Sequence, residues 1–322
     1  MRTPRGLAHY RNRFNQLAAA VGSAREGSHA TLGEVQALRA ELASLAGPVG
    51  SLAEQVKRLA DAAEAQTADL AGFRTDAIEG LRRVHANEAW HRRRLRAVRD
   101  SAEYERAFTA PDPLISVLIA TYERLDLLRE RTLPSVMAQE YRNFEIVIVG
   151  DNSPYGEAQI REGFEDAPIR FANLTMRGPY PEEPLRRWQV AGTPPLNEAM
   201  HLALGAWLAP FDDDDRMRPR HLRVLLDHAR KHRLEFVYGR FHYHLPEIDR
   251  PHGSFPPRLG EIGLQVALMH GALRFFELEL ADAIWGVPND WGYIERLARA
   301  GVRIGMIDEV VTDYHPSVKP VG

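Results

Sequence analysis

Apolar residues in the first third of the chain recur at alternating intervals of three and four positions. This spacing is the seam of a heptad repeat, in which one helix packs its apolar face against another helix. The region from about residue 30 to 106 is therefore predicted to be helical, with a less regular pattern after residue 70. The seam consists of Leu32, Val35, Leu38, Leu42, Leu45, Val49, Leu52, Val56 and Leu59, followed by Leu70, Phe73, Ala77, Leu81 and Val84.

Gly47 and Pro48 interrupt this helical pattern, although the apolar register continues across them. Because proline is tolerated in the first turn of a helix, we expect either a kink or a helix–turn–helix with Pro48 opening the second segment. The seam must be buried against a partner helix. A second copy of the chain is the favoured partner, which predicts a homo-oligomer. A helix of the same chain folded back, or packing on the rest of the chain, is the alternative.

From Pro113 onward the pattern changes to short apolar runs that alternate with helical periods. This order predicts an α/β fold with a mostly parallel sheet and helices on both faces. Two prolines within residues 107–113 indicate a linker. The predicted domains are a helical N-terminal region (1–106), a linker (107–113) and an α/β domain (114–322). The predicted strands are 115–120, 144–149, 169–172, the run before Asp212 and 235–238, and the predicted helices are 125–139, 155–163, 196–205, 219–232 and 288–300.

The composition is that of a globular protein of 322 residues, with 44% hydrophobic and 26% charged residues and a net charge of −3. That charge gives no argument for nucleic-acid binding. The absence of cysteine excludes disulfides and thiolate sites and fits a reducing cytoplasm. No apolar run approaches the ~20 residues of a spanning helix. We expect a cytoplasmic protein, with peripheral contact at the inner membrane face as a second expectation. The basic stretch 91–99 favours a solvated helix face over contact with acidic lipids.

Polar clusters follow three of the predicted strands, at residues 121–124, 151–153 and 212–215. The carboxyl ends of parallel strands meet at one edge of a sheet, where ligands bind. The third cluster is a run of four aspartates, whose like charges repel one another unless they are neutralised. A Mg²⁺ or Mn²⁺ ion carrying a diphosphate would neutralise them, because hard cations prefer oxygen ligands. The alternative is a solvated acidic loop that caps the next helix.

Residues 115–124, 135–139 and 144–153, followed by the aspartate run, resemble the opening of family 2 glycosyltransferases. These enzymes have the GT-A fold and use nucleotide-diphosphate sugars. The resemblance extends from about residue 113 to 315 and leaves the N-terminal third unmatched. It implies a metal-dependent inverting glycosyltransferase that moves a sugar from a nucleoside-diphosphate sugar to an acceptor hydroxyl, with UDP or dTDP as the favoured nucleotide and a saccharide as the acceptor.

The resemblance implies that several residues contact the nucleotide. Thr121 and Tyr122 end the first strand, where a hydroxyl bonds the nucleotide and a ring stacks on its base, and Arg124 follows them. Tyr122 has simple packing at a strand end as its alternative. Asp151 matches the aspartate that accepts the N–H of the base, with a turn residue as its alternative. The family more often has two aspartates here, and this chain has Gly150 in the first place.

Arg186 lies in a stretch where an arginine of the family reaches the nucleotide, and a guanidinium suits phosphate recognition. Its alternative is a surface ion pair with Glu182 or Glu183.

The aspartate run resembles the metal motif of the family, with Mn²⁺ or Mg²⁺ as the implied cofactor. Asp214 is the implied direct ligand, while Asp212 and Asp213 face the ribose or the waters of the metal. Asp212 is a further candidate ligand, and His315 resembles a late histidine that approaches the metal. Asp215 is the expected cap of the following helix.

Asp290 resembles the carboxylate that removes the proton of the acceptor hydroxyl. The family has glutamate immediately before it, where this chain has Asn289. Capping of its own helix is the alternative role for Asp290. His270 occupies a position where the family lines its acceptor cleft, although a lone histidine is more often structural. His242 and His244 alternate on one strand face, which favours a solvated face over a metal pair.

Two rival functions share parts of this pattern. A nucleotidyltransferase would combine a similar sheet with an acidic metal site, but would usually show a glycine-rich phosphate loop after the first strand, which residues 121–124 are not. A catalytically inactive sugar-nucleotide-binding fold on a coiled-coil scaffold is the other rival, and Asn289 is the feature that favours it.

Overall fold

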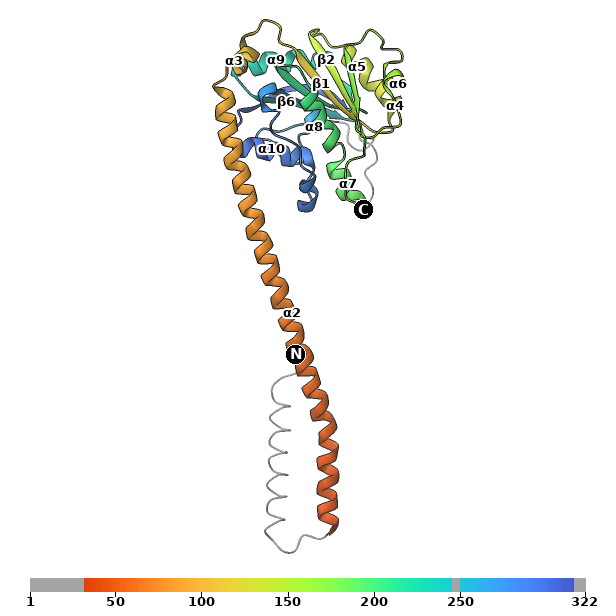
Figure 1. Ribbon diagram of the computed structural model, residues 1–322, viewed down its shortest axis with the longest axis vertical. Coiled ribbons are helices and arrows are strands. Elements are labelled where there is room, and N and C mark those ends of the chain that lie inside the picture. The colour runs from red at the N-terminus through yellow and green to blue at the C-terminus, as the bar shows by residue number, and fades with distance from the viewer. Residues whose placement is uncertain (1–31, 245–249, 316–322) are drawn as a thin grey trace. The chain divides into compact units, whose positions relative to one another are not determined.

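The computed structural model describes residues 32–244 and 250–315 and divides the chain into two compact units, Met1–Arg83 and Val84–Gly322 (Figure 1). This boundary differs from the predicted one at residue 106. The second unit therefore begins inside the region predicted as N-terminal helix. The chain before residue 32 lies outside the described residues, so the part of the predicted helical region that falls there is not described.

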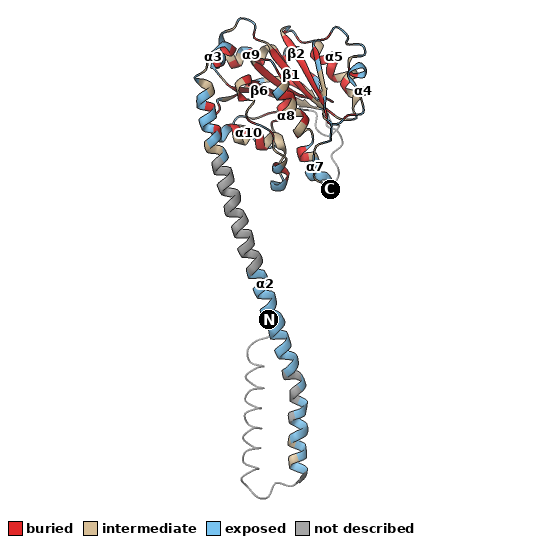
Figure 2. Ribbon diagram, in the orientation of Figure 1, coloured by how far each residue is buried: buried red, intermediate tan, exposed pale blue. Residues whose placement is uncertain are grey.

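A single helix, α2 (Leu32–Arg99), occupies most of the predicted helical region. It continues through Gly47 and Pro48, so the helix–turn–helix alternative is wrong. Among its seam residues, Leu52, Val56 and Leu59 are 40%, 58% and 71% exposed. Figure 2 colours much of α2 as exposed. For nine further seam residues the structure does not describe the side chain: Leu32, Leu42, Leu45, Val49, Leu70, Phe73, Ala77, Leu81 and Val84. Within the described ranges, none of the helices combines the length and apolarity needed to cross a bilayer.

The short helix α3 (Ala102–Thr109) lies where the linker was predicted to begin. Ser101 caps it by accepting the Tyr104 N–H at 3.2 Å. Ala107 and Phe108 are buried, and the Trp207 indole donates to the Ala107 carbonyl at 3.0 Å. The first residues of the predicted 107–113 linker thus belong to a helix packed in the second unit. Apolar burial at 107 and 108 outweighs the two prolines that follow.

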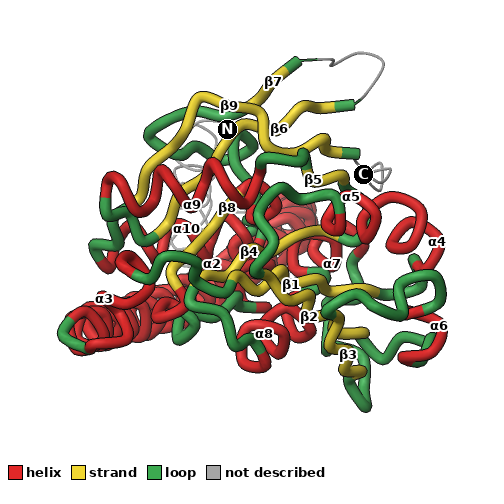
Figure 3. The backbone as a smooth tube through the Cα atoms, turned by 90° about the horizontal axis from the view of Figure 1, so that it is seen from above, coloured by secondary structure: helices red, strands yellow, loops and turns green. Residues whose placement is uncertain are grey.

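The second unit is built on one mixed sheet with the strand order β3-β2-β1-β4-β8-β6-β9-β5, with β7 paired to β6 (Figure 3). Neighbours from β3 to β4 are parallel, as are β6 and β9, whereas β8 runs antiparallel to β4 and β6. The mostly parallel α/β sheet is confirmed. The strands are β1 (Ile115–Thr121), β2 (Phe144–Gly150), β3 (Ile169–Asn173), β4 (Trp207–Asp212), β5 (Arg216–Met217), β6 (Phe236–Tyr243), β7 (Pro251–His252), β8 (Ala267–His270) and β9 (Ile304–Tyr314).

The central strands are buried almost throughout, as expected for parallel strands covered on both faces. Every residue of β2 is buried, and β1 and β4 each have one residue that is not. Helix α8 packs against β1 and β2, and α9 against β6, β8 and β9. The helices are α4 (Leu125–Leu127), the π-helical η1 (Leu128–Thr132), α5 (Leu133–Met137), α6 (Glu157–Arg161), α7 (Pro184–Val190), α8 (Thr193–Leu202), α9 (His221–His232) and α10 (Asn289–Ala300), with 3-10 turns η2 (Leu264–Val266), η3 (Gly271–Leu273) and η4 (Leu280–Trp285).

A buried carboxylate, Glu235, ties the end of α2 and helix α3 to the sheet. It is fully buried and accepts two hydrogen bonds from the Arg99 guanidinium at 2.7 Å, one from the Tyr104 hydroxyl at 2.6 Å and one from the Arg303 N–H at 2.8 Å. Burial alone would raise the pKa of Glu235, but these hydrogen bonds lower it overall. The basic stretch 91–99 is therefore partly structural, since Arg99 is an anchor while Arg92 and Arg96 are exposed.

We predict that Glu235→Gln lowers the free energy of unfolding by about 3–5 kcal/mol, because it leaves the Arg99 charge without its buried partner. Chemical denaturation followed by circular dichroism measures the change. Glu105→Gln, which removes an exposed ion pair between α3 and Arg233 at the end of α9, is the matched control and should shift the midpoint little. Equal effects of the two substitutions would contradict the anchoring role of Glu235.

Candidate functional site

Three parallel strands end side by side at the edge of the sheet where the polar clusters were predicted. The register pairs Thr121 of β1 with Gly150 of β2, and Ala120 of β1 with Asp212 of β4. The residues that follow these strands are therefore brought to one edge, and the shared placement predicted from the strand order is confirmed. The backbone is left-handed at Glu123 and Asn152, with φ of 52° and 54°, so the chain turns sharply just beyond two of the strands.

Side chains that follow β1 hold the aspartate run in place. The Thr121 hydroxyl donates to Asp213 Oδ2 at 2.8 Å. One nitrogen of Arg124, Nη1, lies 3.1 Å from Asp213 Oδ1 and 2.7 Å from Asp214 Oδ2. Arg124 thus supplies a positive charge between two aspartates. Thr121 and Arg124, predicted as nucleotide contacts, are brought to the site, where they pair with the aspartates.

The helix after β1 contacts the backbone of the same run. Its π-helical turn η1 carries Arg131, whose Nη1 donates to the Asp214 carbonyl at 2.6 Å, and Thr132, whose hydroxyl donates to the Asp215 carbonyl at 3.0 Å. Single π-turns occur frequently at functional sites because they change which residues of a helix face a neighbour. Sequence analysis missed Arg131, since a continuous helix was expected and no motif marks the residue.

The aspartate run carries more negative charge than its surroundings neutralise. Asp212 reaches solvent at the end of β4, yet the surrounding protein and the charges of Asp214, Asp213 and Asp290 raise its pKa to about 8. Burial raises the pKa of Asp213 to about 6, although Arg124 opposes the change. Burial also raises the pKa of Asp214 against the opposing charges of Arg124 and Arg131. A bound cation would relieve this repulsion.

Asp215 has a different role from the predicted helix cap, and that prediction is wrong. Helix α9 begins at His221, and its N-cap Arg220 makes no side-chain cap. The Asp215 carboxylate is instead fully buried and accepts the His315 N–H at 2.8 Å through Oδ1. Its Oδ2 is buried without a hydrogen-bond partner. The packing of β9 against β5 brings residue 315 there, which the local sequence around Asp215 does not reveal.

The donor set of the run fits a hard divalent cation held by one or two carboxylates. Among the described residues, the ligand atoms of Asp212, Asp214 and His315 do not converge to within 4.8 Å of one another. Mg²⁺ sites commonly use only one or two carboxylates together with substrate phosphates, so a complete protein cage is not required. The exposure of Asp212 and the raised pKa values of the run agree with such a site.

Asp290 lies in the first turn of α10, near the aspartate run. Its charge is close enough to Asp212 to contribute to the raised pKa of that residue. Burial raises the pKa of Asp290 itself to about 6, although hydrogen bonds from the backbone oppose the change. The Trp291 N–H donates to Asp290 Oδ1 at 2.6 Å, so the carboxylate also satisfies a helix N-terminal donor. Asn289 donates to the Thr193 hydroxyl at 2.7 Å and joins α10 to α8.

Asp151, which follows β2, is bonded through both carboxylate oxygens by donors from the loop after β3. Its Oδ1 accepts the Gly178 N–H at 2.9 Å, and its Oδ2 accepts the Tyr180 hydroxyl at 2.6 Å. The guanidinium carbon of Arg177 lies 3.7 Å from the centre of the Tyr122 ring and its Nε lies 3.9 Å from Asp151 Oδ2. Arg177 and Tyr180 were missed by sequence analysis, and their position in the loop after β3 is the signal that points to them.

Gly150 occupies the place where the family more often has a first aspartate. A Cβ atom there would lie 2.4 Å from Asn173 Oδ1 and 3.0 Å from the Ser153 Cβ. Asn173 accepts the Ser153 N–H at 2.9 Å and donates to the Ser153 carbonyl at 2.8 Å. The side chain of Asn173 therefore fills the space beside Gly150 and stabilises the turn that carries Asp151.

Two other residues lie apart from these contacts. The Arg186 side chain on α7 is 58% exposed and forms a long ion pair of 3.9 Å with Glu183. The alternative surface pair is thus present. His270 is buried and stacks on Tyr104, and it bonds the Tyr104 carbonyl and the Ala272 N–H. Both ring nitrogens are used by the chain, so the prediction that His270 lines an acceptor cleft is wrong and its role is to hold α3.

The comparison with a protein-family model concerns this same region. The family model described as glycosyl transferase family 2 matches residues 116–180 and 188–278. WcaA of Escherichia coli (strain K12), named as a colanic acid biosynthesis glycosyl transferase, is 30% identical over 37% of this chain and 39% of its own length. The succinoglycan biosynthesis protein ExoO of Rhizobium meliloti (strain 1021) is 29% identical over 36% of this chain and 30% of its own length. The aligned part thus spans well under half of each relative.

A solved structure extends the comparison to the fold. Residues 1–349 of S. aureus TarS, in complex with UDP-GlcNAc, match with a TM-score of 0.50 and 17% identity over 64% of this chain and 60% of that chain. At this identity the likeness concerns the fold alone. The sheet therefore has the architecture of a GT-A domain. The family model covers β1 to β8, including the aspartate run, and the chain belongs to glycosyl transferase family 2.

Proposed function

We propose that the chain is a metal-dependent inverting glycosyltransferase that moves a sugar from a nucleoside-diphosphate sugar to an acceptor hydroxyl. One observation carries the proposal: the carboxylates of Asp212, Asp213 and Asp214, from one strand end, share a sheet edge with Asp290, from a helix far along the chain. Such a grouping supplies both a site for a cation and diphosphate and a nearby base. The names of the polysaccharide-biosynthesis relatives support a saccharide acceptor.

The loops after β1, β2 and β3 are proposed to hold the nucleotide. Tyr122 and Arg177 form a stacked pair on which a base would lie, since aromatic and guanidinium faces both stack on bases. Asp151 accepts two hydrogen bonds, and a carboxylate has about four acceptor positions, so it can also accept the N–H of uracil or thymine. UDP or dTDP is therefore the favoured nucleotide, and TarS, which has this fold, was solved with UDP-GlcNAc.

The diphosphate is proposed to lie beside the aspartate run. Asp214 and Asp212 would hold Mn²⁺ or Mg²⁺, with His315, which follows β9 and whose N–H bonds Asp215, close to Asp214. When bound, the cation neutralises charge that develops on the leaving diphosphate. Thr121 and Arg124 keep Asp213 and Asp214 in position. Arg186 remains a candidate for phosphate contact, because its long ion pair with Glu183 leaves the guanidinium accessible.

Asp290 is proposed to act as the general base. Its carboxylate accepts the proton of the acceptor hydroxyl while the acceptor oxygen bonds the anomeric carbon and the bond from that carbon to the diphosphate oxygen breaks. The acceptor enters opposite the leaving group, so the configuration inverts. Burial, which raises the pKa of Asp290 to about 6, makes it a stronger base than an exposed aspartate. The Trp291 N–H fixes one carboxylate oxygen.

We predict that the purified protein, with Mn²⁺, a panel of nucleoside-diphosphate sugars and saccharide acceptors, releases nucleoside diphosphate and forms glycosylated product. Asp290→Asn is expected to lower kcat by about 10²–10⁴-fold, the usual contribution of a general base, with nucleotide affinity retained. Asp227→Asn, an exposed aspartate of α9, is the matched control and keeps wild-type turnover.

Other products would overturn this proposal in different ways. Release of pyrophosphate would identify a nucleotidyltransferase. Binding of the metal and nucleotide by the wild-type protein without turnover would identify an inactive scaffold. Mass spectrometry of the products and calorimetry of nucleotide binding separate these outcomes.

The pH dependence gives a second test. Because Asp290 must be deprotonated to act and its pKa is raised to about 6, kcat should be constant above pH 6 and fall about tenfold per pH unit below it. Protons also compete with the cation at Asp212 and Asp214, whose pKa values are raised, so the apparent metal affinity should fall as pH is lowered. Raising the Mn²⁺ concentration should restore the activity that is lost through weaker metal binding. It should leave the fall of kcat below pH 6 unchanged. A kcat limb that moves with metal concentration would contradict the assignment to Asp290.

We also propose that the exposed seam of α2 pairs with the same seam of a second chain. Leu52, Val56 and Leu59 lie on one stripe of a helix whose described side chains from 50 to 67 are all exposed. Burial of apolar side chains between two such helices stabilises a dimer.

Val56→Lys is predicted to shift the chain from dimer to monomer in sedimentation velocity, because a charge in the seam cannot be buried without a partner. The control Glu54→Lys introduces the same side chain away from the seam and should leave the dimer intact. A monomeric wild-type chain at micromolar concentration would contradict the pairing.

A further inference from the structure

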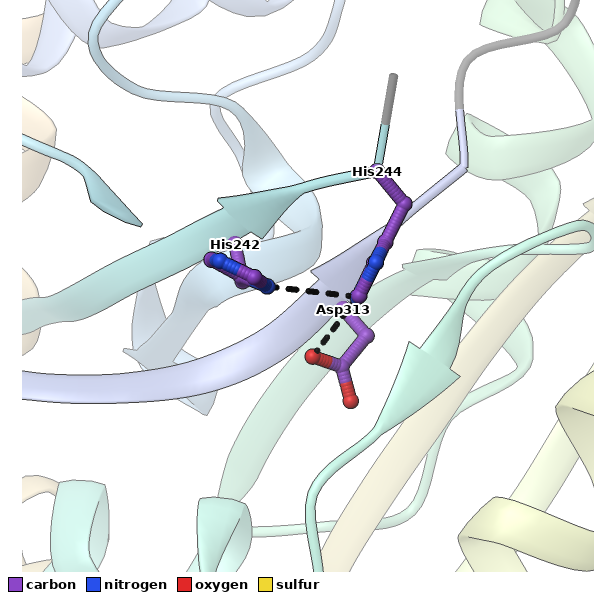
Figure 4. Close-up of side chains that lie close together, drawn as sticks. All are labelled: His242, His244 and Asp313. Atoms are coloured by element: carbon purple, nitrogen blue, oxygen red, sulfur yellow. Dashed lines mark hydrogen bonds and ion pairs between the residues drawn. The ribbon is translucent and has the colours of Figure 1, made fainter. Parts of the chain in front are cut away.

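A second group of potential metal ligands lies at the ends of β6 and β9. The two strands are parallel, and the register pairs His242 with Asp313 and Tyr243 with Tyr314. Because alternate residues of a strand face the same side, His242 and His244 share a face, and Asp313 lies across from them. Figure 4 shows the three side chains pointing toward one another from the two strands. This convergence joins residues about 70 positions apart.

The distances within the group match those of a metal site. His242 Nδ1 lies 3.4 Å from His244 Nε2, which lies 3.1 Å from Asp313 Oδ1. All three ligand atoms lie within 4.8 Å of one another. Tetrahedral Zn²⁺ with bonds of about 2.0–2.2 Å places its ligand atoms about 3.3 Å apart. Two of the three distances between ligand atoms are therefore already close to this value. Rotation of side chains at the strand ends would shorten the third distance, between His242 and Asp313.

Neighbouring residues fix the ligands as a metal site requires. Arg218 donates to Asp313 Oδ1, the same oxygen that faces His244, through Nη2 at 2.7 Å and Nε at 3.2 Å, and these bonds orient the carboxylate. The His315 ring stacks on His244 with centroids 4.9 Å apart, and its Nδ1 lies 3.1 Å from the Asp313 carbonyl. Metal-binding histidines and carboxylates are generally held by such outer contacts.

We propose that His242, His244 and Asp313 bind Zn²⁺. Two imidazoles and one carboxylate suit Zn²⁺, whereas the all-oxygen aspartate run suits Mg²⁺ or Mn²⁺. Three protein ligands leave a fourth position open for water or substrate. A bound ion cross-links β6 to β9 directly beside His315, whose N–H is bonded to Asp215. This site is distinct from the cation site of the proposed glycosyl transfer and does not depend on that function.

The test uses the full chain, freed of metal with a chelator and titrated with Zn²⁺ by calorimetry and with Co²⁺ by visible absorption. We expect one Zn²⁺ per chain at this site and the visible bands of four-coordinate Co²⁺. His244→Gln and, separately, His242→Gln should each weaken Zn²⁺ binding at least about 100-fold, since even outer contacts of a metal site are worth 10–100-fold. Circular dichroism shows that each variant is folded.

Two matched controls locate the ion. His232→Gln removes a histidine whose ring lies 4.4 Å from that of His228 on α9, a pair that offers a competing surface site. Asp214→Asn removes the implied ligand of the aspartate run. Neither control should change the affinity of the site or the Co²⁺ spectrum. Zn²⁺ binding that survives both His242→Gln and His244→Gln, or that is lost in either control, would overturn the proposal, and neither result bears on glycosyl transfer.

Discussion

The fold is organised around the need to hold four adjacent carboxylates at one edge of a largely dry sheet. Burial, together with the charges of Asp214, Asp213 and Asp290, raises the pKa of Asp212 to about 8, so the run depends on compensating contacts from other segments. Arg124 shares one guanidinium nitrogen between Asp213 and Asp214, and Thr121 binds Asp213. Thr121 and Arg124 lie at and just beyond the end of β1. They reach the aspartate run because β1 and β4 are parallel neighbours and end at the same edge. The same excess of negative charge is what makes the edge suitable for a cation and a diphosphate.

Positioning of the reactive groups depends on rigid elements more than on flexible loops. The run follows a buried strand, and its backbone carbonyls are bonded by Arg131 and Thr132 of a π-helical turn. Asp290 is held in the first turn of α10, which is joined to α8 by the bond between Asn289 and Thr193. Asn289 thus has a structural partner of its own. Its presence in place of glutamate is compatible with a working base at the next position, because the two side chains point to different partners.

Two different kinds of cation chemistry lie close together in the second unit. The aspartate run presents oxygen atoms alone, whereas His242, His244 and Asp313 present two imidazoles and a carboxylate. His315 connects the two groups, because its backbone N–H bonds Asp215 and its ring stacks on His244. At the other end of the sheet, Glu235 performs a purely structural task and anchors α2 and α3 through Arg99 and Tyr104. Carboxylates thus belong to the proposed cation sites at one edge of the sheet and form a structural anchor at the other.

The sequence by itself determined the strands β1, β2 and β4 and the polar residues that follow them, because buried parallel strands are continuous apolar runs and their ends are chemically distinct. It also determined that α10 begins near Asp290. Only the tertiary structure decided that α3 packs where a linker was expected, that β8 runs antiparallel between β4 and β6, and that His270 supports Tyr104. It likewise decided the stacking of Arg177 on Tyr122 and the meeting of His242 with Asp313. The physical reason is that these contacts join residues about 30 to 170 positions apart, whose proximity depends on sheet order and register, and neither of these is encoded in local periodicity.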